Sequence, residues 1–392
     1  MTREEVRAEI LSLCEKVKVI NHIETMKNLI GNCSNIVLYG AGHAGSVFKN
    51  YFDNYLPEKK IKCFLNKGAD IKPEYLGYSV YKPDDERLDS DFRNNSVVIL
   101  TLLSTEDVYD KIEQLLLSLG YPHIVNGYYT NISLLNGHES IIHFAEDAEI
   151  IEAAFNMMED EHSRNVFYST FQAHATINYK LPLQSEGMVQ YFDVDVPFRH
   201  KYRSFVDCGA YIGDTFEELV KLHNVENYFA FEPDMQNYEK LIETVKKFPN
   251  IQSVLFPLGI SDYNKFLHFT SNGSAGRIDN RVDNTINSYY SVGKTIPEDI
   301  IIQTVRLSDV LKGYDKLMIK MDIEGSEIAA LNGAKELIIK TKPDLAVSVY
   351  HKPTDLWRIP YLLKEWVPEY KIFMRNHHAY TIETVVYATI KE

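Results

Sequence analysis

Twice along this chain, a short apolar run leads directly into a glycine turn and then into a segment with the apolar spacing of a helix. The first instance is Ile36–Tyr39 before the turn Gly40–Gly45, and the second is Ser204–Cys208 before the turn Gly209–Gly213. A buried strand, a tight turn and a helix in this order are the repeating unit of a parallel α/β sheet. The sequence therefore predicts an α/β protein with two Rossmann-like domains.

The length of the chain agrees with more than one domain. Its 392 residues exceed one ordinary core, and 45% hydrophobic with 24% charged residues is a globular composition. We place the boundaries where the alternation of strands and helices stops and restarts. They define an N-terminal amphipathic helix at 1–30, a Rossmann-like domain at 31–135, a helical connector or lid at 136–201 and a second α/β domain at 202–392.

The second domain is expected to hold seven strands that end in a hairpin. We place them at Ser204–Cys208, Tyr228–Phe231, Ile251–Phe256, Leu317–Met321, Leu345–Tyr350, Lys371–Met374 and Thr384–Thr389. In the connector, Ala148–Met158 and Ser163–Phe171 have helical patterns. The N-terminal helix is predicted from one apolar stripe, formed by Val6, Ile10, Leu13, Val17, Ile20 and Ile23. Such a stripe suits docking or the formation of a homo-oligomer.

Charge and composition exclude several classes of partner. A net charge of −14, without a long basic run, opposes binding to a nucleic acid backbone. The start Met1–Glu5 is charged and the most apolar run, Ser96–Leu103, is too short to span a bilayer, so we expect no membrane insertion. The four cysteines show no metal-binding spacing, which favours reduced thiols and a cytoplasmic location.

Two linked signals in the second domain predict a nucleotide-like cofactor site. Asp207 ends a buried strand, and Gly209 and Gly213 in the following turn permit close approach of a ligand to the backbone. The next strand ends in Glu232, 25 residues after Asp207, where a carboxylate can accept hydrogen bonds from both ribose hydroxyls. Asp214 and Glu217 form a capping-box pattern for the intervening helix.

A third strand end adds Ser261 and Asp262 to the same predicted edge of the sheet. Asp262 can accept a hydrogen bond from an adenine amino group, although an isolated Asp is also a common turn former.

These residues resemble the FkbM family of methyltransferases. The matching stretches are Phe205–Thr215, Phe231–Pro233, Lys320–Glu327 and Ser348–Trp357. The resemblance implies a class I methyltransferase fold and transfer of a methyl group from S-adenosylmethionine to a hydroxyl of a sugar or another small metabolite. The implied cofactor site contains Asp207, Gly209, Ala210, Tyr211, Gly213, Asp214, Thr215, Glu232, Pro233, Ser261 and Asp262. One departure is Arg375-Asn-His-His378, where relatives usually carry an Arg-His pair.

The strand end after Leu317–Met321 carries the candidates for chemistry. Asp322 and Glu324 could orient an acceptor, activate its hydroxyl or hold a divalent cation, although a solvated loop before Glu327 is the alternative. Without a histidine-rich ligand set, we expect chelation to have a modest effect. We expect His351, at the next strand end, to act as general base with Asp322 orienting it, or else to be a satisfied polar group. Lys320, His377 and His378 are reserve candidates.

Four aromatic residues could form a rim on which a sugar ring stacks, namely Tyr191, Phe192, Tyr211 and Trp357. Ordinary core packing is the alternative, and it is favoured for Phe192.

The first domain carries a second glycine motif. Gly40, Gly42 and Gly45 match the dinucleotide fingerprint, but Asn66 stands where the ribose-binding acid is expected. The domain is similar to nucleotide-sugar-binding Rossmann units of sugar-modifying enzymes. A nucleotide or nucleotide-sugar site, a scaffold and a dimerisation module remain open.

The leading hypothesis is an S-adenosylmethionine-dependent O-methyltransferase that acts on a sugar or glycan precursor. The competing enzyme class is an NAD- or nucleotide-sugar-dependent enzyme centred on Gly40–Gly45, and Asn66 and the lack of an evident Tyr-x-x-x-Lys pair count against it. A non-enzymatic binding or scaffold protein is the third possibility.

Overall fold

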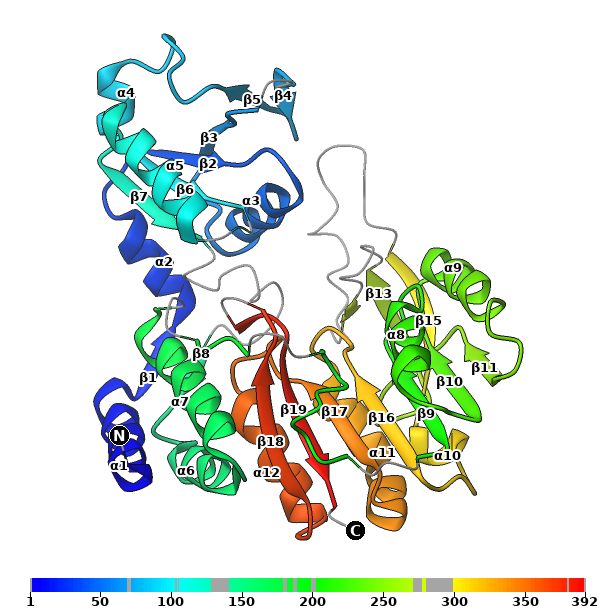
Figure 1. Cartoon of the computed structure of the whole chain (residues 1–392). Coiled ribbons are helices and arrows are strands. Elements are labelled where there is room, and N and C mark those ends of the chain that lie inside the picture. Colours follow the sequence, from blue (N-terminus) through cyan, green and yellow to red (C-terminus); the bar gives the residue numbers. More distant parts are fainter. Residues whose placement is uncertain are drawn as a thin grey trace.

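The computed structural model shows two sheets of mainly parallel strands, one above the other in Figure 1. It describes residues 2–68, 72–102, 104, 106–127, 141–178, 182–185, 189–198, 202–270, 277–279, 299–378 and 381–390. Among these residues, no helix is both long and apolar enough to cross a membrane.

The first sheet has the order β4-β5-β3-β2-β6-β7. Its strands are β2 (Asn35–Tyr39), β3 (Ile61–Leu65), β4 (Glu74–Tyr75), β5 (Tyr78–Tyr81), β6 (Ser96–Leu100) and β7 (His123–Asn126). The helices around it are α3 (His43–Tyr55), α4 (Ser90–Asn94) and α5 (Glu106–Ser118). β2 and β6 are almost wholly buried, which explains their continuous apolar sequence. β4 and β5 were not predicted, because they are short and lack such a run.

The second sheet confirms the prediction of a seven-stranded methyltransferase-like fold. Its order is β11-β10-β9-β16-β17-β19-β18, and only β19 runs antiparallel to its neighbours. The strands are β9 (Ser204–Cys208), β10 (Asn227–Phe231), β11 (Gln252–Phe256), β16 (Leu317–Met321), β17 (Asp344–Ser348), β18 (Lys371–Asn376) and β19 (Thr384–Thr389).

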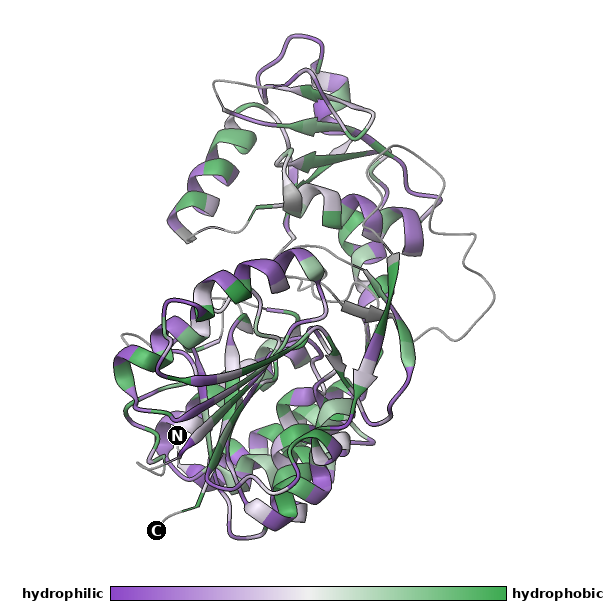
Figure 2. Ribbon diagram, turned by 90° about the vertical axis from the view of Figure 1, so that its right-hand side faces the viewer, coloured by the Kyte–Doolittle hydropathy of each residue, from purple (hydrophilic) through white to green (hydrophobic). Residues whose placement is uncertain are grey.

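Helices cover both faces of the second sheet because its strands alternate their side chains between two cores. Val206 packs with α11 (Glu327–Thr341) and α12 (Asp355–Trp366) on one face. Its neighbour Phe205 packs with α8 (Asp214–Leu222) and α9 (Met235–Val245) on the other. Figure 2 shows the resulting layers, with apolar strands between helices that carry hydrophilic outer faces.

The N-terminal segment differs from the predicted single helix. α1 (Arg3–Val17) ends where Lys18 adopts a positive φ of 56°, and β1 (Val19–Asn21) and α2 (His22–Ile30) follow. β1 pairs with β8 (Ile141–His143), which removes Ile20 from the helical stripe. The remaining stripe is buried against the chain itself, since α1 packs on α6 and α7. This side of α1 thus packs within the chain, and formation of a homo-oligomer stays a prediction.

The two connector helices pack against the second sheet and its helix α12. α6 (Ala148–Met157) packs against α12, and α7 (Glu161–Thr176) packs against the edge strand β18. Arg375 fixes this packing: its guanidinium is 3.4 and 2.8 Å from the two oxygens of Asp160 and donates to Ser163 Oγ at 2.8 Å. The Arg375 side chain is 2% exposed. Arg375, the first residue of the Arg-Asn-His-His stretch that differs from the Arg-His pair of relatives, thus has a structural role.

A smaller sheet, absent from the predictions, follows β11. It has the order β12-β15-β13-β14, with strands β12 (Gly259–Ile260), β13 (Phe266–Thr270), β14 (Arg277–Asp279) and β15 (Asp299–Val305). A short helix, α10 (Leu307–Val310), leads from it to β16.

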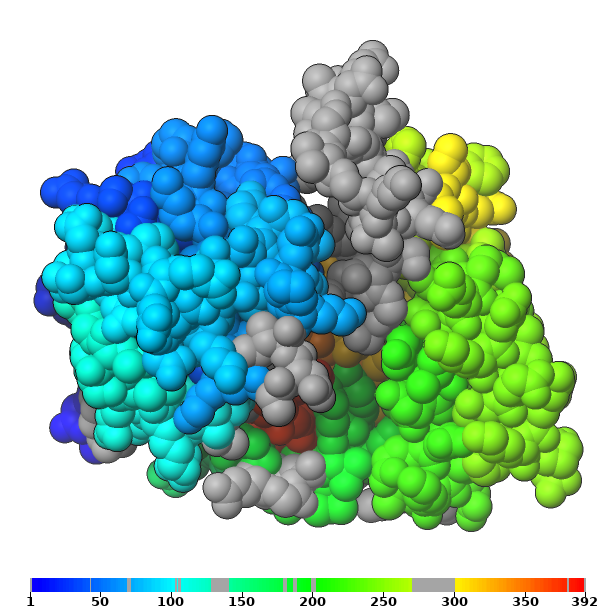
Figure 3. Space-filling view, turned by 90° about the horizontal axis from the view of Figure 1, so that it is seen from above, coloured from blue at the N-terminus to red at the C-terminus, as the bar shows by residue number. Residues whose placement is uncertain are grey.

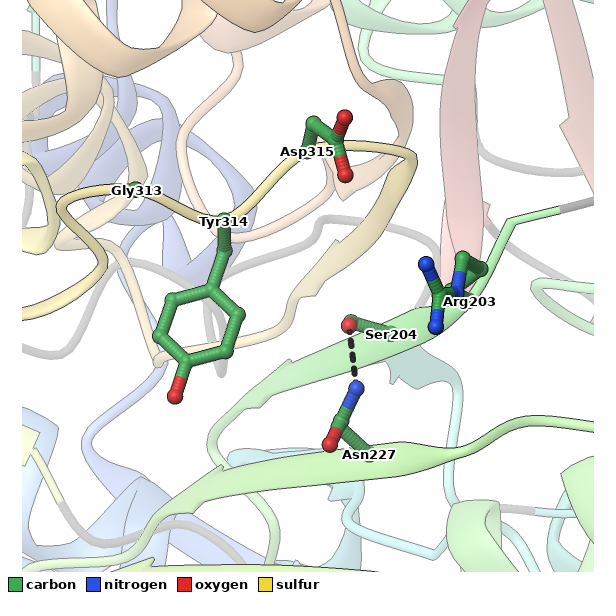
Figure 4. A pocket seen from close by; sticks show the side chains of 6 residues that line it. All are labelled: Arg203, Ser204, Asn227, Gly313, Tyr314 and Asp315. Atoms are coloured by element: carbon green, nitrogen blue, oxygen red, sulfur yellow. Dashed lines mark hydrogen bonds between the residues drawn. The ribbon is translucent and has the colours of Figure 1, made fainter.

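A depression of about 230 Å³ lies at the amino ends of β9 and β10. Arg203, Ser204, Asn227, Gly313, Tyr314 and Asp315 line it (Figure 4). Ser204 Oγ there accepts a hydrogen bond from Asn227 at 3.1 Å. The predicted site residues follow the opposite ends of these strands, so this depression is separate from them.

Candidate active site

The predicted site residues meet at the carboxyl edge of the second sheet. The parallel strands β9, β10, β16 and β17 end at this edge, and the antiparallel strand β19 begins there. In Figure 1 the edge faces the first sheet. Figure 3 looks down on it and shows a hollow between the blue-to-cyan and the green parts of the chain, with green and red atoms at its floor.

Asp207 and Lys320 form a buried ion pair beneath this edge. They are direct neighbours in the β9–β16 register, and Lys320 Nζ lies 3.1 Å from Asp207 Oδ1. Tyr228 donates to the other carboxylate oxygen at 3.1 Å, and Asp207 has 0% exposure. Burial opposes the charge of Lys320, but the nearby carboxylates of Asp207 and Asp322 outweigh it and raise the Lys320 pKa. Lys320 therefore stays protonated and is unsuited to act as a base.

The turn after β9 has the backbone that only glycine accommodates easily. Gly209 has φ 82°, and a Cβ added to it would lie 2.0 Å from the carbonyl oxygen of Asp322. Lys320 Nζ also donates to the Gly209 carbonyl at 2.7 Å. Ala210 is buried and its N–H donates to the Phe231 carbonyl, which holds the turn against the end of β10. Contacts with Asp322, Lys320 and Phe231 thus hold the turn in place.

Glu232 lies at the end of β10 beside this turn. Its two carboxylate oxygens accept hydrogen bonds from the N–H groups of Tyr211 at 2.8 Å and Asp234 at 2.9 Å. Asp234 in turn caps α9, so the stretch around the half-buried Pro233 ends the strand and begins the helix. Burial raises the pKa of Glu232 to about 7, although the two backbone N–H groups oppose this. The structure joins Glu232 to the glycine turn, as the two linked motifs predicted.

The predicted capping box at α8 is not formed. Gly213, with φ 85°, is the N-cap, and Asp214 is the first helical residue. The exposed Asp214 side chain accepts from the N–H of Thr215 at 3.0 Å, while Glu217 pairs with Lys247 at 2.7 Å. The glycine conformation displaced the cap by one residue, because the turn needs the left-handed region at position 213.

Ser261 and Asp262 lie after β12 and not directly after β11. Ser261 is buried and donates to Asp262 Oδ1 at 2.9 Å. Asp262 is half-buried and also lies 3.6 Å from Lys265. The side chain of Asp262 is 34% exposed, so a bound ligand could still reach it.

Asp322 is the central carboxylate of the edge. Its N–H donates to the carbonyl of Cys208, which ties it to the glycine turn. Tyr191 donates to Asp322 Oδ2 at 2.6 Å, and Tyr350 donates to Oδ1 at 3.3 Å. Two phenols from different parts of the chain thus orient this carboxylate.

His351 is enclosed by three carboxylates. Its Nδ1 lies 2.9 Å from Glu327, and its Nε2 lies 3.4 Å from Asp322 and 3.5 Å from Glu324. Burial alone would lower the pKa of His351, but Glu327 and Glu324 outweigh it and raise that pKa well above its ordinary value. In the ligand-free protein His351 is therefore protonated at neutral pH. The surrounding carboxylates thus favour the charged form of His351 when no ligand is bound, and a role of His351 as general base stays a prediction.

Glu383, at the turn before β19, belongs to the same edge and was missed by the sequence analysis. Its carboxylate accepts a hydrogen bond from Gln190, which also donates to the Tyr191 hydroxyl at 2.9 Å. Burial and the charge of Asp322 raise the pKa of Glu383 to about 7. The start of an antiparallel strand next to parallel strand ends was the signal that could have found it.

The predicted aromatic rim is not formed. Trp357 has 0% exposure and donates to Asp147 at 2.7 Å, so it is a core residue. Phe192 packs against Phe205 in the core, as the alternative reading expected. Tyr191 is buried and holds Asp322, which leaves Tyr211 as a half-buried aromatic residue beside the glycine turn. His377, a reserve candidate, lies 2.8 Å from the Tyr387 hydroxyl.

The glycine turn of the first sheet has the expected strand, turn and helix. A Cβ on Gly45 would lie 2.2 Å from the Gly40 carbonyl oxygen, so Gly45 permits close packing of helix and turn. A Cβ on Gly42 would meet nothing within 4 Å. The side chain of Asn66 is engaged locally, since its Oδ1 accepts from the N–H of Gly68 at 3.1 Å.

Comparisons with known proteins give one family match and one similar solved structure. Residues 207–378 match the family model described as the methyltransferase FkbM domain. The fold is similar to a crystal structure of a methyltransferase FkbM from Methylobacillus flagellatus KT, with 18% identity, a TM-score of 0.70, and 99% of this chain and 100% of that chain covered. At this identity the structural likeness shows a shared fold across both sheets. Among curated proteins, no significant match was found.

The matched range begins at Asp207 and includes Glu232, Asp322 and His351 at one edge of a seven-stranded sheet. The chain is therefore a methyltransferase whose C-terminal part is an FkbM methyltransferase domain.

Proposed function

We propose that this enzyme transfers the methyl group of S-adenosylmethionine to a hydroxyl of a sugar or glycan precursor. The observation that carries the proposal is the position of Glu232, a buried carboxylate held by the backbone of Tyr211 beside the Gly209 turn. A carboxylate at the end of the second strand of such a unit binds ribose hydroxyls. The free lone pairs of Glu232 can accept those hydrogen bonds.

When bound, S-adenosylmethionine supplies an electrophilic methyl group on a sulfonium. The Gly209–Gly213 turn and Glu232 would hold the cofactor, whose methyl group would then be transferred to an acceptor beside the carboxylates after β16. The acceptor oxygen forms a bond to the methyl carbon as the carbon–sulfur bond breaks, and the products are the methyl ether, S-adenosylhomocysteine and a proton. Alignment of oxygen, carbon and sulfur can contribute about 7–11 kcal/mol to the lowering of the barrier.

The acceptor side of the edge suits a molecule rich in hydroxyl groups. The carboxylates of Asp322 and Glu324 are 19% and 29% exposed and can accept hydrogen bonds from it. Tyr191 and Tyr350 hold Asp322 in position. We assign the proton from the acceptor to Glu383, because Gln190 and Tyr191 link its carboxylate to Asp322 and its raised pKa of about 7 suits proton transfer at neutral pH.

The test is calorimetric titration with S-adenosylhomocysteine, with NAD and a nucleotide-diphosphate sugar as comparison ligands. We expect micromolar binding of S-adenosylhomocysteine that weakens roughly tenfold or more in Glu232→Ala, since a hydrogen bond to a charged group contributes about 1.5–3 kcal/mol. Glu217→Ala is the matched control, because that acid pairs with Lys247 away from Glu232. Binding of NAD without binding of S-adenosylhomocysteine would overturn the proposal.

A further inference from the structure

The carboxylates around His351 form a cluster with more acid than base. Glu327 has 0% exposure and His351 4%, while Asp322 and Glu324 border the same imidazole. A proton on His351 supplies one positive charge against three carboxylates. The nearby Lys320 is already paired with Asp207 and the Gly209 carbonyl.

Hydrogen bonding does not satisfy this cluster either. Among the described residues, neither ring nitrogen of His351 has a hydrogen bond of regular geometry, and Glu327 Oε2 has no partner. The other oxygen of Glu327 accepts from the N–H of Ile323 at 3.0 Å. A buried charged oxygen without a partner is costly, so the arrangement calls for a further positive group.

The spacing of the side chains fits a metal ion. One ligand atom each from Asp322, Glu327 and His351 lies within 4.8 Å of the other two. An octahedral ion with bonds of about 2.1 Å places its ligand atoms roughly 3–4 Å apart, so a small inward movement completes the site. Oxygen ligands with one imidazole suit Mn²⁺ or a similar divalent ion.

We propose that Asp322, Glu327 and His351 bind a divalent cation of the Mn²⁺ type at the carboxyl edge of β16 and β17. The cation supplies the missing positive charge, and His351 binds it as a neutral imidazole. This extends the expected Asp322–Glu324 metal pair, because the fold adds Glu327 and His351. Resting on the proposed function, Asp322, Glu327 and His351 would hold the ion beside the acceptor, where it would act as a Lewis acid on the acceptor hydroxyl while Glu383 took the proton.

The test is a Mn²⁺ titration of the full chain without cofactor, followed by electron paramagnetic resonance of the free ion. We expect one bound Mn²⁺ per chain and affinity at least tenfold lower in Asp322→Asn and in His351→Gln. The Asp322→Asn variant is the main one, because its side chain is 19% exposed and the substitution keeps the shape. Glu217→Gln is the control and should bind Mn²⁺ as the wild type does.

Titration of the same samples with S-adenosylhomocysteine separates this inference from the proposed function. We expect Asp322→Asn to keep S-adenosylhomocysteine binding, which also shows that the variant is folded. Equal Mn²⁺ affinity in wild type and Asp322→Asn, or no Mn²⁺ binding by wild type, would overturn the metal site. Loss of Mn²⁺ binding together with intact S-adenosylhomocysteine binding supports it. Mn²⁺ binding without S-adenosylhomocysteine binding would refute the proposed function alone.

Discussion

The backbone of Gly209 lies directly against the backbone of Asp322, and a Cβ at position 209 would lie 2.0 Å from the Asp322 carbonyl oxygen. The N–H of Asp322 also donates to the carbonyl of Cys208, the residue before Gly209, at 3.1 Å. The proposed cofactor turn and the proposed acceptor carboxylate are therefore packed back to back. A displacement of one therefore requires a displacement of the other.

We predict that Gly209→Ala strongly destabilises the protein and abolishes binding of S-adenosylhomocysteine, because the added methyl group overlaps the Asp322 backbone. Gly313→Ala is the matched control: Gly313 has φ 92°, similar to the 82° of Gly209, but its Cβ would meet nothing within 4 Å. The control should lose only about 1 kcal/mol from the left-handed backbone. Urea unfolding of both variants measures the difference. An equal loss in the two would show that the contact with Asp322 contributes nothing.

We predict that Glu232→Gln weakens cofactor binding. We also predict that the unfolding free energy of the ligand-free variant, compared with that of the wild type, is more favourable at high pH than at low pH. The folded protein holds the Glu232 proton with a pKa of about 7, against an ordinary 4.5. The contribution of Glu232 to the free energy of unfolding is therefore fully present below about pH 4.5. As the pH rises through 7, about 3 kcal/mol of it is lost. Gln keeps its neutral form throughout.

The measurement is the unfolding free energy of wild type and Glu232→Gln at pH 5 and pH 8. The difference between the two proteins should shift in favour of the variant at pH 8. Glu217→Gln, an exposed acid, should show no such shift. A difference that does not change with pH would contradict the raised pKa of Glu232.

We predict that Glu383→Gln lowers turnover by roughly 10²- to 10⁴-fold, the range for loss of general-base assistance, and leaves S-adenosylhomocysteine binding intact. In the wild type, kcat should rise with pH as Glu383 loses its proton, and the pKa of that group in the ligand-free protein is about 7. This rise should disappear in the variant and return in part in Glu383→Asp. A kcat of Glu383→Gln within threefold of the wild type would rule out Glu383 as the proton acceptor.

The local motifs were readable from the sequence because each lies within a short stretch of chain. A buried apolar run, a glycine turn and a strand-end acid specify Asp207, Gly209 and Glu232 without knowledge of the rest of the fold. The same local rules placed β9, β16 and β19 at their observed bounds. These rules failed at Lys18. The apolar stripe predicted one helix that continues past this residue, but Lys18 adopts a positive φ and the helix ends there.

The sequence by itself determined the two α/β units, the seven strands of the second sheet and the strand-end acids Asp207, Glu232 and Asp322, because local patterning sets strands, turns and helices. Only the tertiary structure decided what those acids contact. The order β16-β17-β19 brings Glu327 to His351 and the Glu383 turn to the same edge. Hydrogen bonds such as that from Gln190 to Glu383 join residues 193 positions apart. Such contacts depend on strand order and on burial, which set the protonation of His351 and Glu383 and which no short stretch of sequence contains.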